Sequence, residues 1–193
     1  MYEYIQGKIA ELTPASVVID NNGVGYFINI SLNTYAGLTG KENAVLFIHQ
    51  VVREDAHTLY GFFGKSEREI FRHLISVSGI GANTARMMLS SLSPAEIKEA
   101  ILSGNVKLLN SVKGIGAKTA QRIVVDLSDK VGKAEISGDF LMAESNTNRE
   151  EALSALVMLG FAKNTIEKVL DKLLKNNPNA GVEELVKQAL KSF

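Results

Sequence analysis

Two short segments of the sequence carry nearly the same residues. SVSGIGANTARMML begins at Ser76 and SVKGIGAKTAQRIV begins at Ser111, so the two copies lie 35 residues apart. In each copy an apolar helical stretch leads into a Gly-Ile-Gly turn, and a second helical stretch follows directly. Glycine tolerates the positive φ of a tight turn, and the new helix begins with unpaired N–H groups at the positive end of its dipole. The pattern predicts an anion site that grips phosphate through backbone groups.

Side chains beside the turns extend this pattern. Arg86 follows the first turn, and Lys118 and Arg122 follow the second, so each is a candidate for an additional phosphate contact. Asn83 stands where the second copy has Lys118, and we therefore expect the second hairpin to carry more of the electrostatic grip. The candidate residues for binding a nucleic-acid backbone are Gly79, Gly81, Asn83, Arg86, Gly114, Gly116, Lys118, Thr119 and Arg122.

A packing explanation of the turns competes with phosphate binding. In a single copy, Gly-Ile-Gly brings two helices close together, with the isoleucine as a core plug, and this needs no ligand. The charge distribution favours phosphate: residues 65–138 hold eleven Lys/Arg against seven Asp/Glu, although the whole chain balances 21 against 21. Duplication within this basic segment resembles the helix-hairpin-helix motif of sequence-independent DNA-binding proteins.

The elements that must position the turns predict a multidomain α+β protein. Residues 1–64 hold β-branched and aromatic runs such as SVVID and GYFINI, with turn signals between them and no helical period. They predict about five strands, closed into a small OB-type barrel that leaves no exposed edge. Tyr60, Phe62 and Phe63 are interpreted mainly as core and subunit contacts, with base stacking as the alternative.

Residues 65–138 change to a helical period and predict an all-α tandem helix-hairpin-helix domain. Ser66 and Glu69 are spaced as a capping box for its first helix. Ser93 is expected to cap a later helix, with Pro94 in the first turn.

The end of the chain predicts a small separate domain. Residues 139–148 lose periodicity and gather small and polar side chains, which is typical of a flexible linker. Residues 149–193 then hold three short amphipathic stretches, which predict a three-helix (UBA-like) bundle. Such a module more often binds a protein than a substrate.

The sequence excludes several classes of function. The chain has no cysteine, and therefore no disulfide, thiolate zinc site or cysteine-ligated iron–sulfur cluster. GFFGKS and GIGAKT end like an ATP-binding P-loop, but Leu59 replaces the first glycine of one and Ala117 replaces the last glycine of the other. We expect no catalytic residue, metal or cofactor. A cytoplasmic location is expected, since no segment has the length and apolarity of a membrane span or the layout of a signal peptide.

A turn in VVREDAHTLYGF places Glu54 and Asp55 between two predicted strands. With His49 and His57 nearby, a metal or acid–base site is an alternative, but no ligand spacing recurs and neighbouring residues of a turn face different ways. A solvated turn is therefore the default interpretation.

The order of the parts resembles the RuvA family, the junction-recognition subunits of the bacterial Holliday-junction branch-migration helicase. The resemblance rests on GVGY, VVREDAHTLYGF, the two Gly-Ile-Gly hairpins and LVMLGF, and it covers nearly the whole chain. It implies a homotetramer, one or two per junction, that holds four-way junction DNA for branch migration in recombination, repair and the SOS response to DNA damage. It also implies that Glu54 and Asp55 form an acidic pin where strands exchange, while Asn83 replaces a lysine common in the family.

The resemblance further implies protein partners. The terminal module is similar to the part that docks a hexameric RuvB-type ATPase, and Leu156, Leu159 and Phe161 fall within its apolar contact region. A RuvC-type resolvase is a further implied partner. Because the motor hydrolyses the ATP, the chain is expected to be a non-catalytic, DNA-binding subunit of the helicase complex.

Two other functions are open alternatives. One is a helix-hairpin-helix DNA glycosylase or lyase, for which Asp126 is the nearest catalytic candidate, although it lies within the helix after the second turn. The other is a single-strand-binding protein that uses the barrel. Base release from damaged duplex would indicate the first, and preference for single strands over junctions would indicate the second.

Overall fold

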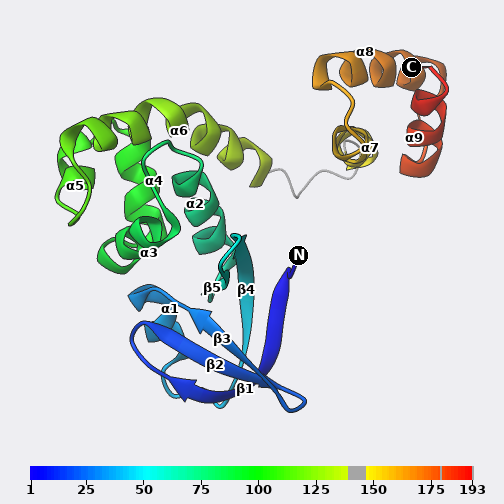
Figure 1. Cartoon of the computed structure of the whole chain (residues 1–193). Coiled ribbons are helices and arrows are strands. Elements are labelled where there is room, and N and C mark those ends of the chain that lie inside the picture. Colours follow the sequence, from blue (N-terminus) through cyan, green and yellow to red (C-terminus); the bar gives the residue numbers. More distant parts are fainter. Residues whose placement is uncertain (139–146, 179, 193) are drawn as a thin grey trace. The chain divides into compact units, whose positions relative to one another are not determined.

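The computed structural model describes residues 1–138, 147–178 and 180–192 of the chain. The chain forms two compact units, residues 1–135 and 136–193, and each is considered by itself (Figure 1). Of the expected linker at 139–148, residues 139–146 lie outside the described residues, and a helix already begins at Thr147.

The first unit begins with a closed five-stranded barrel, which confirms the predicted architecture (Figure 1). The strands pair in the order β1-β2-β3-β5-β4, and β4 returns to β1; β3 and β5 run parallel, whereas the other pairs are antiparallel. Ile5, Ile19 and Leu46 are buried inside the barrel, because alternate side chains of a strand point to its inner face. The strands are β1 (Tyr4–Leu12), β2 (Ser16–Asn21), β3 (Val24–Asn29), β4 (Asn43–Val52) and β5 (His57–Phe62).

A short helix, α1 (Leu32–Leu38), lies between β3 and β4. The expectation that residues 1–64 hold no helical segment is therefore wrong. Ser31 caps α1 by accepting a hydrogen bond of 3.0 Å from the backbone N–H of Thr34. The helix has seven residues, of which Thr34 and Leu38 are buried, so it is too short to produce a recognisable amphipathic period.

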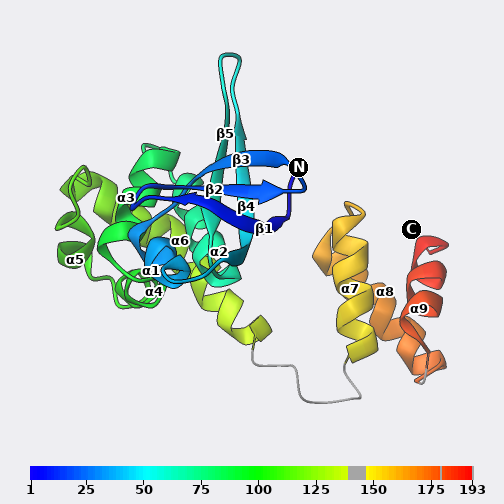
Figure 2. The ribbon, with the colours of Figure 1, turned by 90° about the horizontal axis from the view of Figure 1, so that it is seen from below.

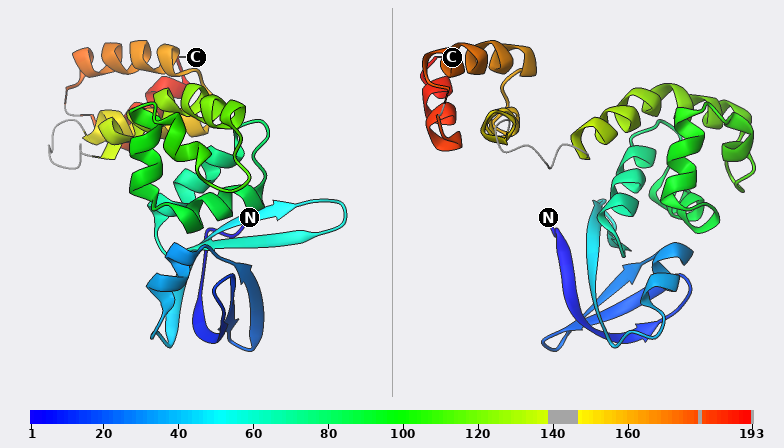
Figure 3. Two further views of the ribbon diagram at one scale, coloured as in Figure 1. Left: turned by 90° about the vertical axis from the view of Figure 1, so that its left-hand side faces the viewer. Right: turned by 180° about the vertical axis from the view of Figure 1, so that it is seen from behind.

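Strands β4 and β5 continue past the barrel as a two-stranded ribbon. Their pairing extends to Val52 and His57, and a hydrogen bond of 2.8 Å from the Arg53 N–H to the Ala56 carbonyl closes the turn. Figures 2 and 3 show the ribbon projecting well away from the barrel. The residues of its turn are therefore held clear of the other strands.

Helices follow β5 and share a core with it. Tyr60 and Phe62 are buried, and their rings lie 5.2 and 4.8 Å from the ring of Phe71, measured between centroids. This confirms a core role for Tyr60 and Phe62, whereas Phe63 is exposed. The helices confirm the all-α prediction for this segment; they are α2 (Lys65–Ile75), α3 (Ala82–Ser91), α4 (Pro94–Leu102), α5 (Val106–Asn110) and α6 (Ala117–Gly138).

One predicted helix start is confirmed and another is wrong. Ser93 and Glu96 form a reciprocal capping box at α4, and the Ser93 backbone and side-chain hydrogen bonds hold the pKa of Glu96 below its ordinary value. The capping box expected from Ser66 and Glu69 does not form, because α2 already begins after Gly64, which offers no capping side chain.

Polar contacts connect the start of α2 to the barrel and to the segment around α1. The hydroxyls of Ser31 and Thr34 donate to the buried carboxylate of Glu67, whose pKa is raised by burial and lowered in part by these bonds. The neighbouring Arg68 is also buried and pairs with the Glu3 carboxylate at 2.5 Å, which lowers the pKa of Glu3.

The second unit contains three helices in its described residues, as the sequence predicts: α7 (Thr147–Met158), α8 (Lys163–Asn176) and α9 (Val182–Leu190) (Figure 3). Leu156, Ile166, Leu170 and Leu185 fill its core, so the unit has a hydrophobic centre of its own. Across the described part of the chain, no helix is long and apolar enough to cross a membrane.

Candidate nucleic-acid interface

The two Gly-Ile-Gly segments form the same turn. The first connects α2 to α3, and the second connects α5 to α6. Ile80 donates its backbone N–H to the Val77 carbonyl, and Ile115 donates to the Val112 carbonyl, each over 3.1 Å. Both isoleucine side chains are buried in the helical core, so each turn is anchored from inside. The sequence repeat is therefore also a repeat of geometry.

Glycine has two different roles in each turn. φ is +94° at Gly79 and +89° at Gly114, a conformation that other residues adopt only with strain. Gly81 and Gly116 lie directly before α3 and α6, and a Cβ placed on either would meet no other atom within 4 Å. No side chain caps the start of α3. An anion can therefore approach the N–H groups at the beginning of each helix.

The second hairpin presents its basic side chains to solvent. Lys118 is exposed and Thr119 is half-buried. Arg122 is exposed too, and its Nη1 donates a hydrogen bond of 3.2 Å to the Ser78 carbonyl, which connects α6 to the turn of the first hairpin. Lys113, immediately before the second Gly-Ile-Gly, is also exposed. It was not among the predicted residues, although the difference between SVKGIG and SVSGIG marks it as an extra cation beside the turn.

The structure places two predicted residues of the first hairpin against the barrel. The hydroxyl of Tyr60 donates a hydrogen bond of 3.1 Å to Asn83 Oδ1. Arg86 Nη1 donates to the Ala15 carbonyl over 3.0 Å and to Asn29 Oδ1 over 3.1 Å. The barrel thus holds the guanidinium that was expected beside a phosphate. Of the two hairpins, the second presents the exposed basic side chains.

The acidic side chains of Glu54 and Asp55 are exposed at the tip of the β4–β5 ribbon. His57 is exposed beside them, whereas His49 packs on the Phe71 ring and has a pKa lowered first by burial and then by two nearby arginines. Among the described residues, no group of three or more His, Cys, Asp and Glu side chains is arranged to hold a metal ion. The ribbon therefore offers a small negative tip.

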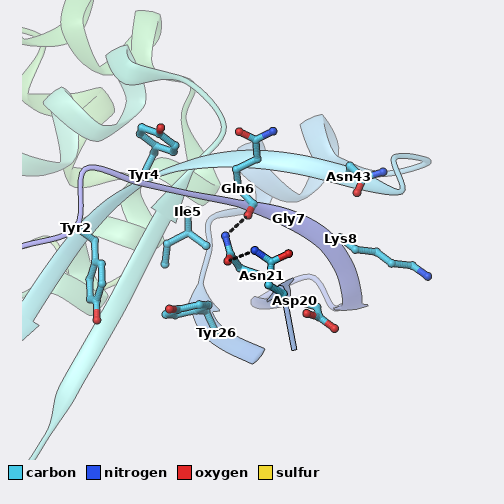
Figure 4. Close-up of a pocket in the computed structure, with 11 residues that line it drawn as sticks. Tyr2, Tyr4, Ile5, Gln6, Gly7, Lys8, Asp20, Asn21, Tyr26 and Asn43 are labelled. Carbon is cyan, nitrogen blue, oxygen red and sulfur yellow. Dashed lines mark hydrogen bonds between the residues drawn. The ribbon is translucent and has the colours of Figure 1, made fainter. Parts of the chain in front are cut away.

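A groove on the barrel adds nothing to the phosphate-binding surface. Within it, Asn21 donates to the Gln6 carbonyl over 2.8 Å, and Lys8 and Asp20 bring opposite charges (Figure 4). The groove is lined by residues that lie outside the helices, so it offers neither a helix start nor an excess of positive charge to a phosphate. It is lined by Tyr2, Tyr4, Ile5, Gln6, Gly7, Lys8, Asp20, Asn21, Asn22, Tyr26 and Asn43.

Comparison with known proteins matches all three parts of the chain. Residues 1–61 match the RuvA N terminal domain, residues 71–129 the SAM-like helix-hairpin-helix tandem, and residues 147–192 the RuvA C-terminal domain. The chain is 54% identical to a protein of Bacteroides thetaiotaomicron, over 99% of both chains, and 54% identical to one of Flavobacterium psychrophilum, over 100% of both. Both relatives are named Holliday junction branch migration complex subunit RuvA.

The chain belongs to the RuvA family. The assignment agrees with the resemblance seen in the sequence, and the matched helix-hairpin-helix tandem includes both Gly-Ile-Gly turns. A third relative, from Christiangramia forsetii, has the same name and is 53% identical over 100% of both chains.

In the part matched by the RuvA C-terminal domain, apolar side chains are exposed where α7 ends. Met158 is 86% exposed and Leu159 is 59% exposed, with Val157 beside them. Leu156, in contrast, is fully buried in the bundle, and Phe161 is half-buried against the same core. Of the three residues expected to contact a partner, Leu159 presents its side chain to solvent, while Leu156 builds the fold.

Proposed function

We propose that this RuvA family member binds four-way DNA junctions without reading their sequence, as the DNA-binding subunit of a branch migration complex. The observation that carries the proposal is the pair of equivalent turns, each with an open glycine in front of a helix start. Phosphates are common to all nucleotides, so backbone donors predict binding without base preference. The names of the relatives support a junction as the DNA form that is bound.

The proposed assembly is a homotetramer, alone or as two tetramers that enclose the junction. Two phosphate sites on a subunit of zero net charge bind weakly, whereas four subunits on one axis match four arms and multiply weak contacts through effective concentration. Tyr4, Phe27 and Val45 support this arrangement, because these large apolar side chains are exposed on the outer face of the barrel. Subunit contacts would cover them.

Glu54 and Asp55 are proposed as the acidic pin at the centre of the assembly. Their carboxylates would repel phosphates by about 1 kcal/mol for a unit pair 4 Å apart in water, and by more in a cavity of lower dielectric constant. This repulsion would keep duplex arms out of the centre and separate the strands that exchange partners there. The support is the exposed position of both residues on a projecting ribbon.

The proposed domains follow the sequence divisions: 1–64 for the barrel, 65–138 for DNA binding, 139–148 as linker and 149–193 for a RuvB-type hexameric ATPase. A RuvC-type resolvase is a further proposed partner, and a cytoplasmic location fits these roles. ATP hydrolysis would belong to the motor, with this chain as a non-catalytic subunit. The exposed end of α7, formed by Val157, Met158 and Leu159, supports docking of a protein there.

A gel-shift competition tests the proposal. The protein is bound to a labelled four-way junction, competed with unlabelled junction, linear duplex or single strand, and the bound species is sized by light scattering. We expect junction to compete much better than the other two DNAs, and bound species of four or eight chains. Equal competition by linear duplex would refute junction recognition, and release of bases from damaged duplex would indicate a glycosylase instead.

A further inference from the structure

One face of α3 is fastened to neighbouring segments of the first unit by polar contacts. Asn83 accepts a hydrogen bond from Tyr60, Arg86 donates to two barrel oxygens, and the Ser90 hydroxyl accepts one of 3.1 Å from the backbone N–H of Leu32. Asn83, Arg86 and Ser90 are spaced by three and four residues, so they share one face of the helix. The first hairpin is therefore held to the barrel through Asn83 and Arg86, and to α1 through Ser90.

Among the described residues, the equivalent face of α6 has no such neighbour. Lys118, Gln121 and Val125 lie 35 residues beyond the three docked residues of α3, and all three are exposed. Since the two hairpins have the same turn geometry, the difference lies in what their second helices contact. The two hairpins therefore differ in their surroundings: the first is docked against the barrel, whereas the second leaves the equivalent helix face exposed.

Arg86 is connected to the strand that carries the acidic turn. Its acceptor Asn29 lies on β3, and the side-chain N–H of Asn29 donates over 3.3 Å to the Leu59 carbonyl on β5. Tyr60, the next residue of β5, makes the direct bond to Asn83. Two hydrogen-bonded routes therefore lead from α3 to β5, and β5 begins immediately after the turn of Glu54 and Asp55. A charged donor makes the Arg86 route the stronger type of bond.

We propose that Arg86 is a positioning residue, which with Asn29 fixes the first phosphate-binding turn relative to the acidic turn. The proposal rests on the proposed junction binding and assigns Arg86 a role different from a phosphate contact. A linear duplex needs only the hairpins, whereas a junction needs the hairpins and the acidic turn at a set distance. Arg86 therefore acts on the preference for junctions over duplex, and little on duplex binding itself.

Binding of junction and linear duplex at several salt concentrations tests this with Arg86→Gln and Arg86→Lys. Lysine keeps the charge but ends one bond short of the Nη1 position, so it does not reach both barrel oxygens. We expect both variants to weaken junction binding about tenfold, the equivalent of one charge-assisted hydrogen bond, with duplex affinity and salt slope unchanged. The proposal would be overturned if Arg86→Lys bound junctions as wild type does. It would also be overturned if Arg86→Gln lowered the salt slope by about 0.9, the value for one phosphate contact.

A double-mutant cycle separates positioning from general destabilisation. Asn29→Ala is expected to lower the junction-to-duplex ratio as Arg86→Gln does, and the double variant to bind no worse than either single one. Lys118→Gln serves as the contrast, because it should weaken binding of both DNAs and lower the salt slope. Additive losses in the cycle, or reduced thermal stability with an unchanged junction-to-duplex ratio, would both contradict the proposal.

A measurement without DNA keeps the inference independent of the proposed function. The chain contains no cysteine, so cysteines introduced at the exposed positions Ser78 and His57 give two unique spin-label sites. Labelled chains are diluted with unlabelled chains before the distance distribution is recorded. A distribution broadened by Arg86→Gln and Arg86→Lys supports positioning, and an unchanged one refutes it. If wild-type protein showed no junction preference, the proposed function would fail while this measurement still decided the role of Arg86.

Discussion

Ile80 and Ile115 occupy matching places in the two hairpins: each is 5% exposed, and each donates its backbone N–H over 3.1 Å to a valine carbonyl three residues earlier. Packing explains these isoleucines without any ligand, as expected for core plugs. The glycines on either side differ in backbone conformation, because φ is positive at Gly79 and Gly114 but not at Gly81 and Gly116. Turn stability and phosphate binding therefore depend on different residues, and substitutions can separate them.

Alanine at the first glycine of each turn is expected to reduce stability. Gly79→Ala and Gly114→Ala place a Cβ at φ values of +94° and +89°, which costs about 1–2 kcal/mol for an L residue. Chemical denaturation of the two variants should give similar losses, because the turns are equivalent. A loss of stability in only one of the two variants would show that the residues around the turn, and not its backbone conformation, determine the destabilisation.

Alanine at the second glycine is expected to reduce DNA binding more than stability. Gly81→Ala and Gly116→Ala put a methyl group into open space, at the point where a phosphate would approach the helix start. We expect junction affinity to fall at least tenfold, about 1.4 kcal/mol. Stability should fall by less than at the first glycine, about 0.5–1 kcal/mol, because Gly81 is the N-cap of α3 and alanine caps a helix less well than glycine. Wild-type affinity in both variants would contradict backbone phosphate binding at these turns.

The salt dependence of binding should show the inequality of the hairpins. Lys118 is exposed, whereas Asn83 is hydrogen-bonded to Tyr60. If Lys118 contacts one phosphate, Lys118→Gln should lower the slope of log K against log salt by about 0.9. Asn83→Ala should leave the slope unchanged and lower stability by about 1 kcal/mol, because the hydrogen bond from Tyr60 is removed. Fluorescence anisotropy titrations across a salt series give the slopes. Equal slope changes in the two variants would argue against a stronger second hairpin.

Neutralising the acidic turn is expected to change strand exchange more than binding. Glu54→Gln and Asp55→Asn keep the shape of both side chains but remove the repulsion of phosphates. Junction affinity should be retained or increased, while the branch migration rate with an added motor changes. Glu11→Gln, an exposed substitution on β1, is the control. A large loss of junction affinity in the turn variant would rule out the pin.

The sequence predicted the features that depend on local residue types. Gly-Ile-Gly identified the turns because each needs a residue without a Cβ, and β-branched runs identified the strands because alternate residues such as Ile19 are buried. α1 was missed because Thr34 and Leu38 are too few buried positions to define a period. Local sequence patterns were therefore sufficient to predict a feature when the residue type is required by a single turn or strand.

The residues whose positions in the structure differ from the sequence predictions are those that depend on contacts between distant segments. Asn83 and Arg86 form a polar helix face that is equally suited to solvent, phosphate or carbonyl groups, and only the barrel packed beside it decides among these. Leu156 and Leu159 are chemically alike and three residues apart, yet one is buried and the other exposed. Helical spacing alone did not show which of them the other two helices cover.

The buried carboxyl of Glu67 predicts a pH-dependent stability. Burial raises its pKa in the folded state above the ordinary 4.5, so the folded chain binds this proton more tightly than the unfolded chain. Its contribution to stability therefore falls as pH rises from about 4.5 through the raised pKa. Glu67→Gln keeps the shape and removes the ionisation, so the stability of the variant relative to wild type should increase over that range.

Glu96 provides a control of opposite sign for this experiment. Ser93 lowers the pKa of Glu96, so its contribution is present above about pH 4.5 and lost as pH falls through the lowered pKa. Glu96→Gln should therefore lose stability relative to wild type at neutral pH and lose less in acid. Urea denaturation between about pH 2.5 and about pH 8 measures both variants, since the Glu96 transition lies below its ordinary pKa. A constant difference between Glu67→Gln and wild type across this range would contradict the pKa assignment.

Two leucines at the end of α7, Leu156 within the helix and Leu159 directly after it, should separate folding of the terminal module from partner docking. Leu156 is fully buried, so Leu156→Ala should destabilise the module by about 2–5 kcal/mol. Leu159 is 59% exposed, and Leu159→Ser should leave the denaturation midpoint nearly unchanged while it weakens binding of a RuvB-type motor. Calorimetric unfolding and motor pull-down of the full chain test the pair, with Leu190→Ser, an exposed apolar residue at the end of α9, as the control. Unchanged motor binding by Leu159→Ser would move the docking site away from the end of α7.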